Sequence, residues 1–238
     1  KIIKKIKEKK RKKKKKKKTV QMVPHVTDHM KGLMREAGED KDSDINIVEI
    51  GGTVGDIENQ VFLEAVRQFR SELPEEDTFL IHTTLVPYLE TVGEQKTKPT
   101  QHSVKELQSL GLEPDMIVGR SEDVLDEDVR EKIALFCDVE DEAVISDPDL
   151  EYIYELPIKL DEQAVDEIVA EKMQLPDRSS GLEKWRSRVE NLQKDSIAEI
   201  AICGKYTDID DSYASVEEAL KHAGAELGGP VDIDYLGT

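Results

Sequence analysis

The hydrophobic residues of this chain fall into short apolar runs that are separated by amphipathic stretches. Short apolar runs bounded by turn residues are typical of buried strands, and apolar positions that recur every three or four residues are typical of helices. On this pattern we expect strands over residues 19–23, 45–50, 78–85, 116–119, 143–145, 198–203 and 231–235. We expect helices over residues 58–73, 101–110, 126–136, 161–173 and 212–222.

The alternation of strands and helices predicts an α/β fold with a doubly wound, mostly parallel sheet and helices on both of its faces. A polar, turn-rich stretch at residues 176–181 interrupts the alternation and indicates a boundary. A short amphipathic segment around Trp185 follows it, and a second βαβ pattern begins near Ile197. We therefore expect one domain over 19–176, a linker over 177–196 and a second domain that starts at 197 and runs to 238.

Charge is distributed very unevenly along the chain. Residues 1–18 hold thirteen lysines, one arginine and one glutamate, which give a net charge of +13. The other 220 residues hold 20 basic and 51 acidic side chains, so they contribute −31 to the total of −18. This excess of carboxylates argues against nucleic acid or an anionic membrane as the main partner. Dense carboxylates also keep a protein hydrated in concentrated salt, and from them we predict a halophilic source.

The lysine-rich, low-complexity segment 1–18 cannot bury enough apolar surface to fold by itself. We interpret it as a disordered tail, a cloning scar or a mistaken reading frame, with a nucleic-acid or nuclear-targeting arm as the alternative. It lacks the apolar stretch of a signal peptide, and the chain has no apolar run long enough to span a membrane. Cys137 and Cys203 give no disulfide framework, so we expect a cytoplasmic location and predict that both cysteines are buried.

A glycine-rich segment, residues 49–58, lies between a predicted strand and a predicted helix. Open α/β sheets bind ligands at the carboxyl ends of their strands, and glycines let the backbone approach a ligand closely. Glu49 can bind Mg²⁺ there, while Asp56 and Glu58 can accept hydrogen bonds from ligand hydroxyls or amines. The alternative is a tight turn in which Asp56 is the N-cap of the helix that follows.

A second candidate site is the segment of residues 96–101, in a region that is otherwise poor in cations. Pro99 and Thr100 suit a helix start, with Thr100 as the N-cap. The N-terminus of a helix exposes unpaired N–H groups and a partial positive charge, and Lys96 and Lys98 lie beside it. The segment is therefore a predicted phosphate site, and the alternative is a pair of solvated lysines near a capping motif.

The histidines are weaker candidates. His25 and His29 are four residues apart, but the predicted helix starts after His25, so we do not expect them to share a metal ion. His82 lies within an apolar strand and is predicted to be packed in the core. His102 follows the lysine pair and either approaches a ligand or caps the helix.

Several long stretches resemble the CTP synthase family, and together they extend over residues 19–238. The string TVGEQKTKPTQHSV, residues 91–104, is the most specific of them, and residues 203–224 resemble the opening of that family's class I glutamine amidotransferase domain. The other matching stretches are TVQ (19–21), PHVT (24–27), VEIGGTVGDIE (48–58), FLEAVRQFR (62–70), the remainder of 82–111, KIALFCDVEDEAVIS (132–146) and IYELP (153–157).

The resemblance implies a ligase that makes CTP from UTP, ATP and glutamine in the final step of de novo CTP synthesis. In this family ATP phosphorylates O4 of the uracil ring, and glutamine-derived ammonia displaces the phosphate. The resemblance also implies Mg²⁺ and a homotetramer whose pyrimidine-nucleotide sites span subunits. The implied residues are Glu49 for Mg²⁺; Asp56, Ile57, Glu58, Lys96, Thr97, Lys98, Pro99, Thr100, Gln101 and Lys132 for UTP or CTP; and Pro148, Asp149 and Leu150 for ATP.

Two parts of the family pattern have no counterpart in the sequence. These are the glycine-rich phosphate loop with its later Mg²⁺-binding aspartate, and the glutaminase cysteine with its later histidine and glutamate. We therefore expect a chain truncated at both ends, with an incomplete P-loop-like synthetase domain and no catalytic residues of its own. It should form no CTP from glutamine and little or none from ammonia. The alternative function is a non-catalytic module that binds pyrimidine nucleotides.

Overall fold

The computed structural model of this chain describes residues 19–39, 43–176, 181–209 and 211–237. The chain divides into two compact units, Lys1–Thr78 with Gln101–Glu113, and Phe79–Thr100 with Pro114–Thr238. In the described ranges no helix combines the length and the apolar character that crossing a membrane requires.

The first unit is built mainly of helices. A short turn, η1 (Met22–Val26), leads into α2 (Thr27–Glu39), which packs against α3 (Gln60–Ser71). Lys31 of α2 is only 7% exposed, and its ammonium group lies 2.6 Å from the carboxylate of Glu72. The unit also contains η2 (Glu75–Asp77). A salt bridge from a buried lysine thus joins α2 to the C-terminal end of α3.

Two strands expected in the first unit are absent from the described residues. Residues 19–21 are irregular and run into η1, and residues 45–50 form no ladder with any described strand. Ile47 is 88% exposed and Ile45 is 56% exposed, although the pattern predicted that this run is buried. An extended segment becomes a strand only when a neighbouring strand satisfies its N–H and C=O groups. Both strand predictions are therefore wrong for this structure.

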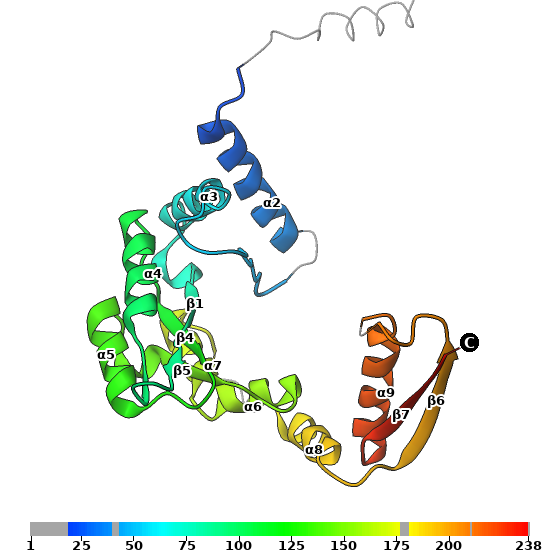
Figure 1. Ribbon diagram of the computed structural model, residues 1–238. Helices are drawn as coiled ribbons and strands as arrows, with labels where there is room; N and C mark the ends of the chain where they lie inside the picture. The colour runs from blue at the N-terminus through cyan, green and yellow to red at the C-terminus, as the bar shows by residue number, and fades with distance from the viewer. Residues whose placement is uncertain (1–18, 40–42, 177–180, 210, 238) are drawn as a thin grey trace, which may run out of the picture. The chain divides into compact units, whose positions relative to one another are not determined.

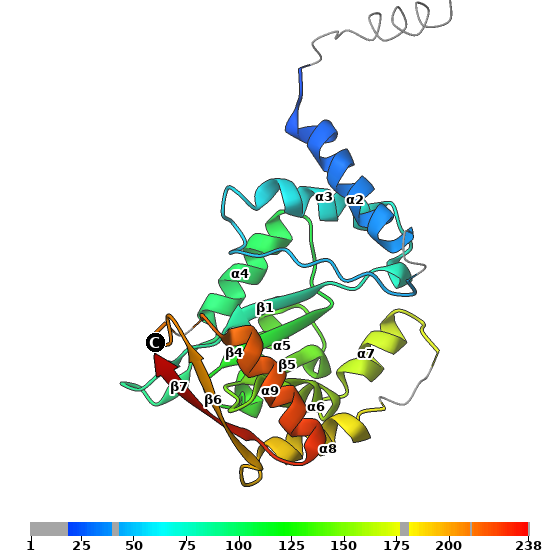
Figure 2. The same ribbon diagram turned by 90° about the vertical axis from the view of Figure 1, so that its right-hand side faces the viewer.

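The second unit contains a parallel sheet of three strands, β1 (Ile81–Leu85), β4 (Met116–Ser121) and β5 (Val144–Pro148), in the order β1-β4-β5 (Figure 2). Leu85 pairs with Arg120 and Ser121 pairs with Pro148, so the three carboxyl ends lie at one edge of the sheet. β4 and β5 are mostly buried, and Figure 1 shows α5 (Glu127–Cys137) and α6 (Leu156–Asp161) on opposite sides of them. The expected α/β class is thereby confirmed.

β1 reverses the usual alternation of apolar and polar positions. Its polar residues His82 and Thr84 are each only 9% exposed, while Ile81 is 48% exposed and Leu85 is 60% exposed. The prediction that His82 is packed in the core is confirmed, and its burial lowers the pKa of the imidazole. On the inward polar face of β1, the hydroxyl group of Thr84 contacts the hydroxyl group of Thr100.

Short elements that the sequence pattern did not predict surround this sheet. β2 (Tyr88–Leu89) and β3 (Glu94–Gln95) form a small antiparallel hairpin before α4 (Lys98–Ser109). The helix expected over 161–173 is confirmed as α7 (Val165–Lys172), and α6 precedes it. Ala164, with φ of 55°, adopts a left-handed conformation that separates α6 from α7. The remaining short turns are η3 (Asp141–Ala143) and η4 (Ile153–Glu155).

The last part of the chain forms the second βαβ pattern that the sequence predicts. After α8 (Glu183–Leu192), the parallel strands β6 (Ala198–Gly204) and β7 (Val231–Gly237) form a separate two-stranded sheet, beside which α9 (Ala214–Leu227) packs (Figure 1). A Cβ on Gly224 would lie 2.5 Å from the carbonyl oxygen of Gly229, so glycine is needed where α9 meets the turn before β7. Cys137 is buried as predicted, but Cys203 is exposed because it lies on a strand face that nothing described covers.

Candidate functional site

The start of α4 is held firmly against the carboxyl end of β1. Thr100 is completely buried, and its hydroxyl oxygen lies 2.8 Å from the hydroxyl oxygen of Thr84 and 3.5 Å from the carbonyl oxygen of Leu85. Thr97 and Gln101 are also buried. The helix begins at Lys98 rather than at residue 101, so the prediction that Thr100 is the N-cap is wrong. Its side chain fixes the first helical turn to the sheet instead.

The predicted lysines of this segment lie near one carboxylate and one helix. The ammonium group of Lys96 pairs with Glu94, and the Lys98 ammonium nitrogen lies 5.7 Å from the centroid of the Phe136 ring on α5. The hydrogen bond from Lys96, together with the charges of Lys96 and Lys132, holds the pKa of Glu94 below its usual value. Lys96 and Lys132, which are distant in sequence, thus both lie close enough to Glu94 to lower its pKa, beside the N-terminus of α4.

The hairpin that precedes α4 is tied to the loop after β4 by Gln95. Its side-chain nitrogen donates to the carbonyl oxygen of Val124 at 3.1 Å, and its side-chain oxygen accepts from the N–H of Asp126 at 3.1 Å. The same loop is tied to β5, because the N–H of Leu125 donates to the hydroxyl oxygen of Ser146 at 2.9 Å. These contacts connect the ends of all three strands, and the sequence offered no signal for Gln95.

Residues 148–150 lie at the same edge of the sheet. Pro148 ends β5, and the N–H of Asp149 donates to the carbonyl oxygen of Glu122 at 3.2 Å. Arg120 donates to the carboxylate of Asp149 at 2.5 Å and to the carbonyl oxygen of Asp147 at 3.1 Å. Arg120 was not among the predicted site residues, although a cation at the carboxyl end of a strand is a signal that could have identified it.

The glycine-rich segment 49–58 belongs to the first unit and is largely exposed. Its backbone makes tight turns, in which the N–H of Asp56 donates to the carbonyl oxygen of Thr53 at 3.2 Å. Gly52, with φ of 87°, leaves space for the side chain of Asn59, which donates to Thr53 at 3.1 Å. Asn59 occupies the N-cap position of α3, so the alternative with Asp56 as the cap is wrong. Glu49, Ile57 and Glu58 are exposed.

No metal-binding cluster is present among the described residues, where no three His, Cys, Asp or Glu side chains converge. Mg²⁺ is bound in octahedral geometry by one or two carboxylates together with waters and substrate phosphates, so Glu49 would supply only one of its ligands. The residues described do not by themselves fit a Mg²⁺ site. His25 precedes α2, as expected, and accepts a hydrogen bond from the N–H of Gln21, while His102 is exposed in the first turns of α4.

Comparisons with known proteins extend over nearly the whole chain. The family model described as CTP synthase N-terminus matches residues 1–175, a range that includes the lysine-rich segment. A CTP synthase of Archaeoglobus fulgidus is 51% identical over 237 residues, 99% of this chain and 44% of the relative. A CTP synthase of Halobacterium salinarum is 50% identical over 99% of this chain and 42% of the relative.

A third relative, a CTP synthase of Symbiobacterium thermophilum, is 49% identical over 220 residues, 92% of this chain and 41% of the relative. The chain therefore spans about two fifths of the length of the curated relatives it matches. The match to the family model and the identities near one half are far beyond what a shared fold alone produces. The chain belongs to the CTP synthase family.

Proposed function

We propose that this chain supplies nucleotide-binding surface to a CTP synthase that makes CTP from UTP, ATP and glutamine. The observation that supports this best is the cationic start of α4 at the carboxyl edge of the β1-β4-β5 sheet. Lysine charges next to the N-terminus of a helix are suited to the oxygens of a triphosphate. Ligands of open α/β sheets are also found at this edge.

The phosphates of UTP, or of CTP as product, are proposed to bind at Lys96, Thr97, Lys98, Pro99, Thr100 and Gln101. The buried contact of Thr100 with Thr84 keeps the helix start in place before the ligand arrives, which reduces the entropy lost on binding. Lys132 extends the cationic surface from α5. Asp56, Ile57 and Glu58 remain proposed contacts to the same nucleotide on the strength of the resemblance alone.

Glu94 gives this phosphate site an internal counter-ion. Its carboxylate forms an ion pair with the ammonium group of Lys96, and a phosphate oxygen can accept a hydrogen bond from the same ammonium group. Binding of a nucleotide then exchanges one anionic partner of Lys96 for another. This exchange keeps the lysines ordered when no nucleotide is bound and limits the cost of crowding cations together.

Residues Pro148, Asp149 and Leu150 are proposed to contact the base of ATP, partly through their backbone. The Arg120 contact and the Glu122 carbonyl hold this segment at the same edge as the phosphate site. Mg²⁺ stays a prediction of the resemblance, with Glu49 as its proposed ligand, because the described residues do not assemble a site for it. No step of the proposal depends on the metal.

The wider properties of the whole enzyme are proposals from the family. They are the phosphorylation of uracil O4, its displacement by glutamine-derived ammonia, the homotetramer and the cytoplasmic location. The start of an amidotransferase domain at 197–238 is supported by the separate βαβ unit found there. The halophilic source also stays a prediction, and a thermal stability that falls as KCl is added would contradict it.

The test of the proposal is a titration of the purified chain with CTP and with UTP by calorimetry. Replacing Lys98 with alanine should weaken binding by about 1.5–3 kcal/mol, or roughly 10- to 150-fold, because a charge-assisted hydrogen bond is lost. Lys105→Ala is the matched control, since Lys105 is exposed on the same helix beyond its first turn. The control variant should bind both nucleotides as the original chain does.

Two outcomes would count against the proposal. Absence of nucleotide binding by the folded original chain would remove the phosphate site, and equal losses in both lysine variants would reduce it to a general charge effect. The alternative of a non-catalytic nucleotide-binding module makes the same binding prediction. Formation of CTP by the whole enzyme from UTP, ATP and ammonium separates the two functions.

A further inference from the structure

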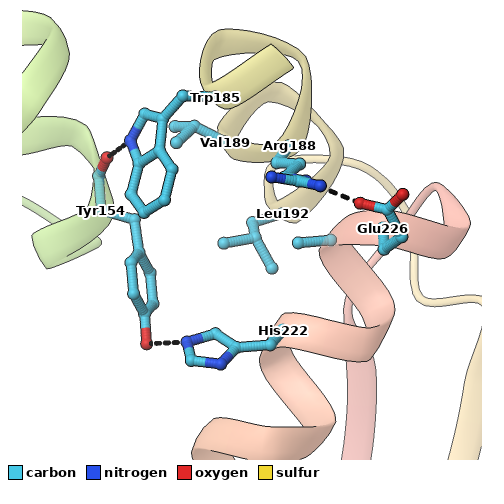
Figure 3. A pocket seen from close by; sticks show the side chains of 8 residues that line it. Tyr154, Trp185, Arg188, Val189, Leu192, His222 and Glu226 are labelled. Carbon is cyan, nitrogen blue, oxygen red and sulfur yellow. Dashed lines mark hydrogen bonds and ion pairs between the residues drawn. The ribbon is translucent and has the colours of Figure 1, made fainter. Parts of the chain in front are cut away.

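A small cavity lies where η4, α8 and α9 meet, with a volume of about 340 Å³ (Figure 3). Its walls are largely apolar, and Val189, Leu192 and Ala225 on them are buried. Tyr154 of η4 faces it from one side, and Figure 3 shows the Tyr154 hydroxyl pointing to His222 of α9. The residues that line the cavity come from these three elements, and Tyr154 and His222 are more than 60 residues apart in the sequence.

Tyr154 makes polar contacts to both of the other elements. Its hydroxyl contacts the carboxylate of Glu218 and lies 2.8 Å from Nε2 of His222, both on α9. Its backbone carbonyl accepts a hydrogen bond of 2.7 Å from the indole N–H of Trp185 on α8. One residue of η4 thus fastens both helices, and we call Tyr154, Glu218 and His222 the tyrosine latch.

The direction of the hydrogen bonds in the tyrosine latch follows from proton counting. The hydrogen bond to Glu218 raises the pKa of Tyr154 to about 12, so the hydroxyl keeps its single proton. The pKa of Glu218 is held below its usual value, mainly by Lys221 and also by Tyr154, so its carboxylate can only accept. The hydroxyl proton therefore goes to Glu218, and His222 must donate its Nε2–H to the tyrosine oxygen.

Ring packing and a second group of contacts support the same junction. The Tyr154 ring lies edge-on to Trp185 at 6.1 Å and to His222 at 5.3 Å between centroids. On the other side of the cavity Arg188 of α8 pairs with Glu226 of α9 at 2.6 Å. The polar side chains described on the cavity walls are thus already paired with one another. This favours an internal joint between elements over a site that orients a small ligand.

The tyrosine latch joins two parts of the chain that lie on either side of the end of the family's N-terminal model. Tyr154 follows the proposed ATP-contacting residues 148–150 by four positions, within the range that matches the family's N-terminal model. Trp185, Glu218 and His222 lie beyond that range, in α8 and α9. We propose that Tyr154 is a positioning residue that sets the orientation of the β6-α9-β7 unit relative to the nucleotide-binding segment. The catalytic part of this inference rests on the proposed function.

The direct test uses this chain and its single tryptophan, Trp185. Tyr154→Phe removes only the hydroxyl and should raise amide hydrogen exchange in α8 and α9 roughly tenfold, with a change in Trp185 fluorescence and unchanged exchange in β4 and β5. Tyr152→Phe, in the residue just before η4, is the matched control and should change neither signal. His222→Gln keeps an N–H donor and should leave the exchange of α8 and α9 at the wild-type rate, whereas His222→Leu should raise it.

The second test compares the rates at which the whole enzyme forms CTP from glutamine and from ammonia. Tyr154→Phe should lower the glutamine-dependent rate of CTP formation at least roughly fivefold and leave the ammonia-dependent rate unchanged. A parallel fall of both rates, or no fall in either, would overturn the positioning role. If the unaltered enzyme makes no CTP, the proposed function fails while the exchange experiment still decides on the tyrosine latch. Unchanged exchange in α9 of Tyr154→Phe would overturn the latch itself.

Discussion

The two segments that the sequence marked as candidate sites have very different surroundings in the structure. The segment of residues 96–101 has three buried polar side chains and is fixed to the end of β1 through Thr100. The glycine-rich segment 49–58 is mostly exposed and is shaped by its own turns and by Asn59. A binding motif thus becomes a defined surface only where strand ends and a hairpin hold it in place.

To test the contrast between the anchored segment 96–101 and the exposed segment 49–58, we expect the largest loss of stability from a substitution in β4. A Cβ on Gly119 would lie 2.7 Å from Leu125 and 3.2 Å from Val86, so Gly119→Val forces atoms into a packed region. We expect the free energy of unfolding to fall by about 3 kcal/mol, at the upper part of the usual range for overpacking. Urea unfolding followed by Trp185 fluorescence measures it.

The matched control for Gly119→Val is the same change in the exposed segment. A Cβ on Gly51 would approach only the flexible carboxylate of Glu49, at 3.3 Å. Gly51→Val should therefore alter stability by less than about 0.5 kcal/mol, as most surface substitutions do. Equal losses for the two variants would contradict the contrast between an anchored and an exposed segment.

Much of the α/β pattern could be predicted because short apolar runs mark strands, even where most residues are exposed in the structure, as in β6 and β7. β4, β5, β6 and β7 were all expected within a few residues of their observed bounds, and so was α5. The strand at 45–50 failed for a different reason. An apolar run shows that a segment prefers burial, but a strand also needs a hydrogen-bonding neighbour, and no described strand pairs with this one.

The candidate site was predicted in part. Its lysines were identified because cations are scarce in an acidic chain, and the structure places Lys96 and Lys132 around one carboxylate. Gln95 was missed because its role depends on tertiary contacts with a loop far along the chain, whereas Arg120 could have been identified as a cation at the carboxyl end of a strand. Thr100 was assigned to the correct helix turn with the wrong role, since sequence cannot show that a strand hydroxyl lies opposite it.

A smaller effect is expected from the hydroxyl pair that anchors α4. Thr100→Val keeps the shape but leaves the buried hydroxyl of Thr84 without its partner, which should cost about 1–2 kcal/mol of stability. Replacing both threonines with valine should recover most of that loss, because no polar group is then left unpaired. Thr53→Val in the exposed segment is the control. A double variant less stable than Thr100→Val would contradict the anchoring role.

Charge also contributes to the stability of the first unit, to which the exposed segment 49–58 belongs. Glu64 of α3 accepts two hydrogen bonds of 2.8 Å from Arg67 and one of 2.7 Å from Gln68. These hydrogen bonds, from Arg67 first, lower the pKa of Glu64 to about 2. The ionised form is thus favoured in the folded state, so its contribution is complete above pH 4.5 and disappears as the pH falls toward 2.

The smallest predicted effect is therefore the acid dependence of Glu64→Gln. Because Glu64 is partly exposed, the variant should lose less than about 1 kcal/mol of local stability at pH 7, and this difference should vanish by about pH 2. Amide hydrogen exchange of α3 between pH 2 and 7 measures it, with Glu76→Gln on η2 as the control. A loss that is constant over this pH range would show that packing, and not the charge, explains the contribution of Glu64.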